Sequence, residues 1–217
     1  MDDNILGNGS VEILDIMGDD LAVANAARVS YLGQSKGIEK DKQLIYYLME
    51  HGHMSPFEHV QVKFRIKCPL FVARQWMRYR TWKYNEISRR YTSVDIDFYL
   101  PDELRLQDEV NKQGSIDTNK DNSHLIEKIK KHNEKSHRLY NELRENDISR
   151  ELSRIVFPVS LNTTFIATVD LRNLFNFLHQ RMDAHAQYEI RQYANHIYNE
   201  LKLKFPISMG AFDEHYR

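Results

Sequence analysis

The stretch Arg78-Tyr79-Arg80-Thr81-Trp82-Lys83-Tyr84-Asn85-Glu86-Ile87-Ser88-Arg89-Arg90-Tyr91 lies near the middle of the chain. Five of its fourteen residues are basic, one is acidic and four are aromatic, whereas the whole chain has a formal charge of only -1. Arginine binds phosphate and carboxylate through paired N–H donors, and aromatic rings stack on flat heterocycles. Asn85, Glu86 and Ser88 add groups that can hydrogen-bond the edge of such a ring. The mixture favours a nucleotide site.

The same composition allows another interpretation, a solvated basic loop or a strip that binds nucleic acid. Tyr79, Trp82 and Tyr84 would then be stacking platforms among the arginines. The near-neutral total charge argues against a dedicated nucleic-acid binder, whose domain is usually strongly basic. Composition by itself leaves both interpretations open.

Residues 60–68, which precede this stretch, alternate strictly between apolar and polar. One side holds Val60, Val62, Phe64, Ile66 and Cys68, and the other holds Gln61, Lys63, Arg65 and Lys67. This period of two predicts a half-buried strand with a basic outer face. Pro69 then opens a helix from Leu70 to about Met77, on which Gln75 and Arg78 share one face.

The remaining elements follow from periodicity and from capping residues. Strands are predicted over 11–17 and 162–169, and helices over 19–29, 39–51, 124–145, 148–156, 170–181 and 187–203. Asp19 is the expected N-cap of the first helix. Ser55, Pro56 and Glu58 form an expected capping box. The helix over 124–145 is expected to turn Leu125, Ile129, Leu139 and Leu143 inward.

Bulk properties set the class of protein. With 217 residues, 41% hydrophobic and 28% charged, the chain suits one large soluble domain or two small ones, and 107–122 is a polar segment expected to be a mobile surface insertion. No apolar run reaches the roughly 20 residues that span a bilayer, and the N-terminus lacks a signal pattern. A single cysteine fits a reducing cytoplasm. We therefore expect a cytoplasmic protein with no membrane partner.

The central stretch resembles the signature of the flavin-dependent thymidylate synthases, Arg-His-Arg-x-x-Ser-x-Asn-Glu-x-Ser-x-Arg-Tyr. Seven positions match, and Tyr79 and Lys83 replace the family's His and Ser. The similarity runs from about Val11 to Ala194, with a divergent middle near 105–122. It implies one α/β (α+β) domain over 1–217, with a central, mainly antiparallel sheet flanked by helices. It also implies a homotetramer with active sites at subunit interfaces.

The activity that the resemblance implies is reductive methylation of dUMP to dTMP. Methylenetetrahydrofolate would supply the carbon, FAD the hydride, and NADPH would reduce the flavin. Two alternatives remain: a nucleic-acid-binding module built on 78–91, and an inactive flavin-binding homologue. The second is suggested by Tyr79 and by Asp170, which replaces the usual Asn.

The resemblance also implies the residues of the site. The dUMP contacts would be Gln75, Arg78, Glu86, Ser88, Arg89, Arg90, Arg154 and Arg181. The FAD contacts would be Ser55, Arg78, Tyr79, Arg80, Asp170, Arg172 and Asn176. Arg89 stands where a glycine is common, so a contact made through its backbone should survive best.

Two residues are candidates for a catalytic role. A fixed arginine stabilises negative charge that develops on uracil as its C5 attacks a carbon electrophile, and Arg181, after an apolar helix, is the best candidate. His53 is a candidate for proton relay, since histidine ordinarily changes charge near neutral pH; it could equally only bond to backbone. We expect no metal, because the nearby histidines lack other ligands at suitable spacing. Cys68, on the apolar face, is not expected to be a nucleophile.

Overall fold

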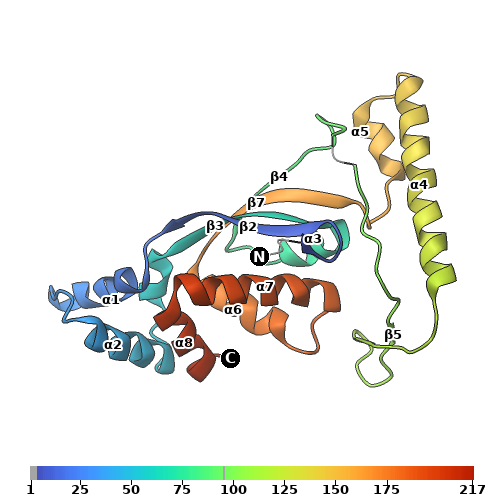
Figure 1. Ribbon diagram of the computed structural model, residues 1–217. Helices are drawn as coiled ribbons and strands as arrows, with labels where there is room; N and C mark the ends of the chain where they lie inside the picture. The colour runs from blue at the N-terminus through green and yellow to red at the C-terminus, as the bar shows by residue number, and fades with distance from the viewer. Residues whose placement is uncertain (1–3, 95) are drawn as a thin grey trace.

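A five-stranded antiparallel sheet forms the centre of the protein, which is seen here in a computed structural model that describes residues 4–94 and 96–217 (Figure 1). The strand order is β1-β2-β3-β7-β4. The strands are β1 Asn4–Ile5, β2 Gly9–Met17, β3 Gln61–Pro69, β7 Asn162–Asp170 and β4 Lys83–Glu86. The predicted fold class and the three long predicted strands are confirmed.

The central strand, β3, explains why the sheet forms in this register. It pairs with β2 on one side, where Ile66 lies opposite Val11, and with β7 on the other, where Phe64 lies opposite Ala167. The inward residues Val62, Phe64, Ile66 and Cys68 are fully buried. The outer face is polar as predicted, with an Arg65–Glu12 ion pair of 2.6 Å across to β2.

Helices cover one face of the sheet and extend from both of its ends. They are α1 Asp20–Arg28, α2 Ile38–Glu50, α3 Leu70–Trp76, α4 Ser123–Glu145, α5 Arg150–Ser153, α6 Leu171–Met182, α7 Tyr188–Lys204 and α8 Pro206–His215. Short 3₁₀ turns are η1 Val29–Tyr31, η2 Ser55–His59 and η3 Arg154–Val156. In Figure 1, α6 and α7 lie against the sheet, α1 and α2 extend to one side, and α4 and α5 stand apart on the other.

The contact between α1 and α2 is polar and buried. Asp19 caps α1 as predicted, accepting a hydrogen bond of 2.8 Å from Ala22 N. Arg28 at the end of α1 forms an ion pair with Asp41 of α2, and the Ser35 hydroxyl donates to the same carboxylate at 2.6 Å. Burial raises the pKa of Asp41, but these hydrogen bonds and the Arg28 charge outweigh it and lower that pKa overall.

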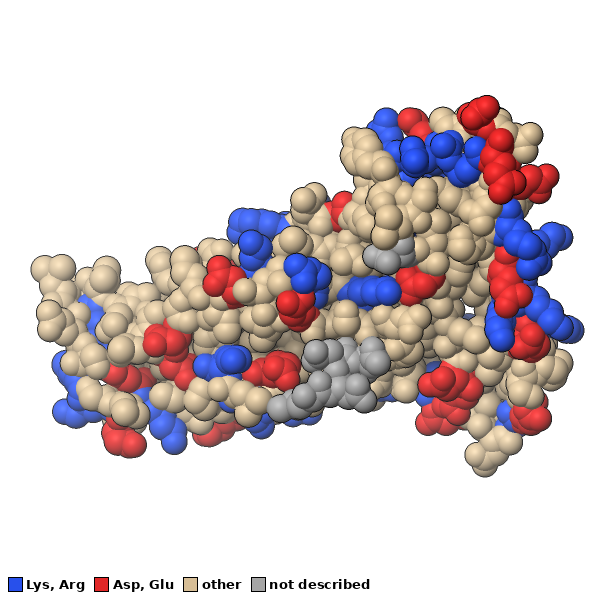
Figure 2. All heavy atoms as spheres, turned by 45° about the horizontal axis from the view of Figure 1, so that its top comes forward, with Lys and Arg blue, Asp and Glu red and all other residues tan. Residues whose placement is uncertain are grey.

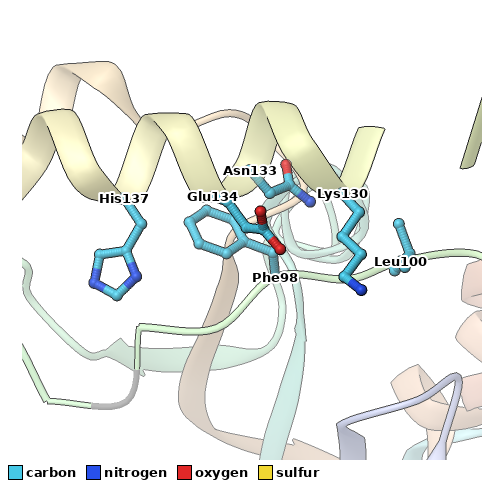
Figure 3. A pocket seen from close by; sticks show the side chains of 6 residues that line it. All are labelled: Phe98, Leu100, Lys130, Asn133, Glu134 and His137. Atoms are coloured by element: carbon cyan, nitrogen blue, oxygen red, sulfur yellow. The ribbon is translucent and has the colours of Figure 1, made fainter. Parts of the chain in front are cut away.

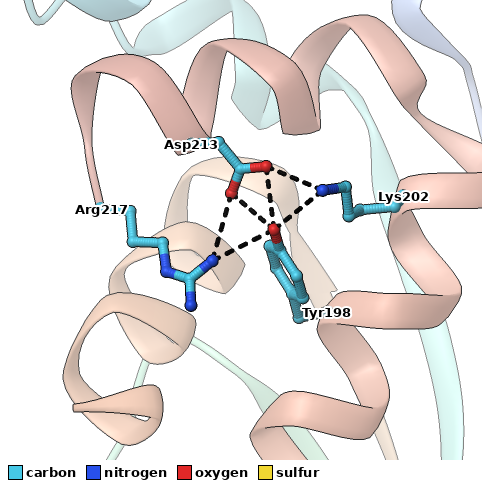
Figure 4. Close-up of polar contacts among 4 residues, drawn as sticks. All are labelled: Tyr198, Lys202, Asp213 and Arg217. Carbon is cyan, nitrogen blue, oxygen red and sulfur yellow. Dashed lines mark hydrogen bonds and ion pairs between the residues drawn. The ribbon is translucent and has the colours of Figure 1, made fainter.

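A second polar network joins α7 to the C-terminal residues (Figure 4). The Tyr198 hydroxyl donates to Asp213 at 2.7 Å, and Lys202 Nζ donates to the same carboxylate at 3.0 Å. Arg217 lies 3.7 Å from Asp213 and donates to the Tyr198 hydroxyl at 3.2 Å. These contacts fasten the last turn of α8 to α7.

Two local predictions are wrong. Ser55 begins η2, and Met54 is the N-cap without a side-chain hydrogen bond, so the expected capping box does not form. Glu58, released from that role, forms an ion pair with Arg172 at the start of α6. The helix over 124–145 exists, but Leu125 and Leu139 are 38% and 42% exposed. Its buried residues are Asn133, Ser136 and Tyr140.

Two segments in which no strand was predicted contain strands. The central stretch includes β4, which pairs with the free edge of β7 from Lys83 opposite Thr168 to Glu86 opposite Phe165. The polar segment 107–122 contributes to a small hairpin of β5 Leu106–Gln107 and β6 Ser115–Ile116. Arg105 braces this hairpin through a 2.9 Å hydrogen bond from Nε to Ser115 Oγ. The mobility of the segment stays a prediction.

Candidate active site

The turn between α3 and β4 carries the first half of the central stretch and is rigidly held. The Tyr84 hydroxyl lies 2.9 Å from the Trp76 carbonyl oxygen and 3.0 Å from that of Tyr79. Trp82 is 3% exposed and packs against Trp76 and Phe177 of α6. Hydrophobic packing therefore fixes the backbone from which Arg78 and Arg80 project.

This packing overturns one part of the nucleic-acid interpretation. Tyr79 and Trp82 are only 8% and 3% exposed, so their faces are not available as stacking platforms for bases. Figure 2 shows basic and acidic side chains interspersed over one face of the molecule, and both kinds occur at the end formed by α4 and α5.

An open cavity of about 520 Å³ lies between this turn and α6, and we call it the signature cavity. It is lined by Arg78, Tyr79, Arg80, Thr81, Asn173, Asn176, Gln180 and Arg181. Three guanidinium groups and three amides thus converge, and none of these lining residues is acidic. Such a donor-rich concavity suits an anionic ligand that also carries hydrogen-bond acceptors.

Arg181 is the most unusual group of the signature cavity. Its guanidinium lies over the Tyr79 ring, 5.3 Å from the centroid. Its Nε is buried and has no hydrogen-bond partner among the described residues. A buried donor without a partner costs free energy, which a bound acceptor would recover.

A second cavity, of about 190 Å³, lies toward the other end of β4, and we call it the β4-end cavity. Glu86, Arg89 and Arg154 line it together with residues of β7. Glu86 accepts a 2.6 Å hydrogen bond from the Thr163 hydroxyl. The buried Arg89 donates to the backbone carbonyls of Asn162, at 3.5 Å, and of Val94. Arg89 thereby braces the loop after β4 through its side chain.

The other predicted nucleotide contacts lie outside both cavities. Arg90 forms a 3.1 Å ion pair with Glu151, and Ser88 Oγ accepts from the Arg90 backbone N–H at 3.2 Å. Gln75 is hydrogen-bonded to Gln187, whose Nε2 donates to Glu189 at 2.8 Å. One chain therefore gathers only Arg78 and Arg181 of this set in the signature cavity, and Glu86, Arg89 and Arg154 in the β4-end cavity.

The predicted flavin contacts lie on α6 or on segments near it. Arg78, Tyr79, Arg80 and Asn176 line the signature cavity. Arg172, which is paired with Glu58, lies one turn before Asn176. Asp170 is the N-cap of α6 and accepts from the Asn173 backbone at 2.9 Å and side chain at 2.7 Å. Ser55 is exposed in η2, the turn to which Glu58 belongs.

The two remaining candidates behave differently. His53 is exposed after α2, and its ring lies edge-on to Tyr47 at 6.0 Å, within an aromatic group that includes His51. Cys68 is 0% exposed, and burial, aided by the negative charge of Glu86, raises the pKa of its thiol. The thiol stays protonated, which supports the expectation that it is not a nucleophile.

Two other cavities lie near the α4 and α5 end, and one of them is lined by the predicted contact Arg90 together with Arg150 and Glu151. Figure 3 shows the other, of about 210 Å³, between α4 and residues 98–100, where Phe98, Lys130, Glu134 and His137 surround an open space. In the part of the chain that the structure describes, no three His, Cys, Asp or Glu side chains come together as metal ligands. No helix along 4–94 and 96–217 combines the length and apolar character needed to cross a bilayer.

Sequence reasoning missed three residues that line the signature cavity, namely Thr81, Asn173 and Gln180. A signal for the two amides was present, because Asn173, Asn176 and Gln180 follow the i, i+3, i+7 spacing of one helix face. The stacking of Arg181 on Tyr79 had no sequence signal, since the two residues meet only through the tertiary fold.

The fold and the signature cavity together define an α+β protein with a rigid, arginine-rich site for an anionic ligand. Residues 12–207 match the model of the family described as thymidylate synthase complementing protein. A flavin-dependent thymidylate synthase of Thermosipho africanus is 47% identical over 214 residues, which cover 98% of this chain and 94% of the relative. The corresponding protein of Kosmotoga olearia is 45% identical over 217 residues, with coverage of 98% and 93%.

A solved structure agrees with these relatives. The UMP/dUMP methylase PolB of Streptomyces cacaoi, bound with 5-Br dUMP, superposes with a TM-score of 0.87 at 32% identity and 95% coverage of both chains. The chain therefore belongs to the flavin-dependent thymidylate synthase family, whose members are methyltransferase enzymes.

Proposed function

We propose that the chain converts dUMP to dTMP by reductive methylation, with methylenetetrahydrofolate as carbon donor and NADPH as the source of reducing equivalents. The observation that carries the proposal is the signature cavity, where Arg78, Arg80 and Arg181 meet without any acidic lining residue. The family membership and the dUMP-analogue complex of the PolB structure agree with a pyrimidine nucleotide as substrate.

The flavin fits the residues present. Its phosphates need cationic donors, which Arg78 and Arg80 supply, and its ring needs hydrogen-bonding groups, which Asn176 and its neighbouring amides supply. The chain would hold FAD along α6, from Arg172 near its start to the signature cavity near its end. Bound FAD supplies the reducing hydride.

The residues of the chain itself bind and polarise the nucleotide. Arg181 presents a fixed positive charge, held by an aromatic face and not by a carboxylate, to the uracil oxygen on which negative charge develops. The dUMP phosphate suits the arginines of the site, which bind it in paired geometry. His53, an exposed ring, remains a proposal for moving protons at the edge of the site.

We further propose a homotetramer in which each site takes the signature cavity from one subunit and the β4-end cavity from another. The two cavities share no lining residue. The segment joining them, from Thr81 to Glu86, spans up to about 16 Å at the rise of an extended strand. Leu152, Ile155 and Val159, at 58%, 74% and 61% exposed, give the α5 end an apolar surface that a second subunit would bury.

A mixing experiment tests the composite site. We expect Arg181→Ala and Arg154→Ala each to abolish dTMP formation and to restore part of it when the two chains are co-expressed. With random pairing about one quarter of the sites are intact. These are the sites whose signature cavity comes from an Arg154→Ala chain and whose β4-end cavity comes from an Arg181→Ala chain.

The matched control pairs Arg181→Ala with Arg78→Ala. Both residues line the signature cavity, so every such cavity carries a defect and no activity should return. Recovery with this control, or none with the Arg154 partner although both variants fold and assemble, would contradict the proposed division. An active monomer in a size measurement would do the same.

A further inference from the structure

Tyr79 occupies the position at which the signature of the family has histidine, and it is buried and closely packed. It is 8% exposed, and its ring meets the edge of Phe177 at 5.1 Å and an angle of 74°. The Tyr84 hydroxyl lies 3.0 Å from its backbone oxygen. Both the ring and the backbone of Tyr79 are therefore immobilised, which makes it a rigid support for its neighbours.

The ring face supports Arg181. The guanidinium lies 5.3 Å from the ring centroid, and no acidic side chain of the described residues forms an ion pair with it. A carboxylate could hold the guanidinium equally well, but it would cancel the charge and occupy the N–H donors. An aromatic face attracts the cation electrostatically and leaves the in-plane donors to a ligand.

The hydroxyl supports a different set of groups. It donates to Gln180 Oε1 at 2.8 Å, and Gln180 Nε2 donates to Asn176 Oδ1 at 3.0 Å. Burial raises the pKa of the phenol, with Arg181 offsetting only part of the rise, so the hydroxyl keeps its proton. The side-chain oxygens of Gln180 and Asn176 each accept one of these hydrogen bonds. The NH₂ group of Asn176 therefore remains as a donor in the signature cavity.

We propose that Tyr79 is a positioning residue with two separable tasks. Its ring fixes Arg181 for the nucleotide, and its hydroxyl orients Gln180 and Asn176 for the flavin. The identities of these two ligands rest on the proposed function. Histidine has a smaller ring and no hydroxyl, so it cannot perform both tasks with this geometry.

Two substitutions separate the tasks, with the affinities for dUMP and for FAD measured by calorimetry on the intact tetramer. Tyr79→Phe keeps the ring, so dUMP affinity should stay within about twofold while FAD affinity falls about three- to tenfold, the usual range for one lost hydrogen bond. Tyr79→Leu removes the ring as well, so dUMP affinity should also fall, by about 5- to 30-fold. Tyr79→Met takes its place if Tyr79→Leu does not fold.

A double-mutant cycle distinguishes positioning from a general loss of structure. If Tyr79 acts on dUMP through Arg181, then Tyr79→Leu should cause no further loss of dUMP affinity in an Arg181→Gln background. A merely structural role would lower the affinity by the same factor in both backgrounds. The matched control is Tyr46→Leu. It removes another tyrosine ring that lies under a cation, since Lys42 Nζ is 5.7 Å from the centroid of the Tyr46 ring, and it should change the affinity for neither dUMP nor FAD.

The outcomes separate this proposal from the one on which it rests. Failure of the unaltered chain to bind dUMP would overturn the proposed function. Two outcomes would overturn only the assignment of Tyr79, provided that the unaltered chain binds dUMP normally. One is additive losses of dUMP affinity in the double-mutant cycle, and the other is undiminished dUMP affinity of Tyr79→Leu. Undiminished FAD affinity of Tyr79→Phe would remove the task assigned to the hydroxyl.

Discussion

Replacement of Cys68 by alanine should cost stability but leave catalysis intact. Cys68 is 0% exposed on β3, opposite Thr163 of β7, and its thiol stays protonated because burial raises its pKa. The other route to thymidylate begins with attack of a cysteine thiolate on the pyrimidine ring, and this chain has one cysteine. A buried, protonated thiol cannot perform that attack.

The expected loss of stability follows from the size of the buried group. Removing a sulfur, which is slightly larger than a methylene, forfeits about 1 kcal/mol of transfer free energy. A residual cavity of about 25 Å³ adds about 0.6 kcal/mol. The sum of about 1.5 kcal/mol lowers the midpoint of thermal unfolding by about 3–6 °C for a chain of this length.

Circular dichroism during heating measures that midpoint, and dTMP formation at about 25 °C measures activity with FAD bound. Cys68→Ser is the companion variant, because its oxygen can still accept from the Ala73 backbone while it lacks a thiol. Both variants should retain most activity. Abolished dTMP formation in a folded, flavin-loaded Cys68→Ala protein would refute the reasoning, and an unchanged midpoint would contradict the assigned burial.

Three further predictions concern charged residues. Arg28→Leu should lower the free energy of unfolding in urea by about 3 kcal/mol, because Asp41 loses its buried partner. The double variant with Arg28→Leu and Asp41→Leu should recover part of that stability, and an equal loss in the single and the double variant would contradict the prediction. Asp213→Asn should destabilise at about pH 6, since hydrogen bonds from Tyr198 and Lys202 outweigh burial and lower the pKa of Asp213. A carboxyl group with a lowered pKa contributes stability that is lost as pH falls. The difference in free energy of unfolding between the unaltered chain and Asp213→Asn should therefore become smaller below pH 3.8, and a difference independent of pH would contradict this prediction. Arg181→Ala should fold and retain FAD but lose dTMP formation, and normal turnover would remove Arg181 from the mechanism.

Local sequence patterns predicted elements that depend on neighbouring residues, such as strands with alternating buried and exposed side chains and helices with a capping residue. The period of two over 60–68 located β3 because Val62, Phe64 and Ile66 face the core without exception. Asp19 was recognised as a cap because its side chain bonds within its own turn. The strand β4 was missed because it is an edge strand whose residues are mostly exposed and which depends on the neighbouring β7.

Other errors arose where tertiary partners replaced local ones. Glu58 has the spacing of a capping box but pairs with Arg172 from a distant helix. On α4 the apolar Leu125 and Leu139 are exposed, whereas the polar Asn133 is buried, and its side-chain oxygen accepts a hydrogen bond of 2.9 Å from the Ser160 hydroxyl. The site residues could be named from the resemblance, but their division between two cavities depends on the path of β4 and could not.

The most direct test of the central claim is dTMP formation by the purified chain, given dUMP, methylenetetrahydrofolate and NADPH, with and without FAD. The signature cavity predicts that dTMP appears only when FAD is bound and that Arg181→Ala abolishes it in a flavin-loaded protein. Formation of dTMP by a flavin-free preparation, or none by a folded, FAD-loaded protein, would contradict the assignment.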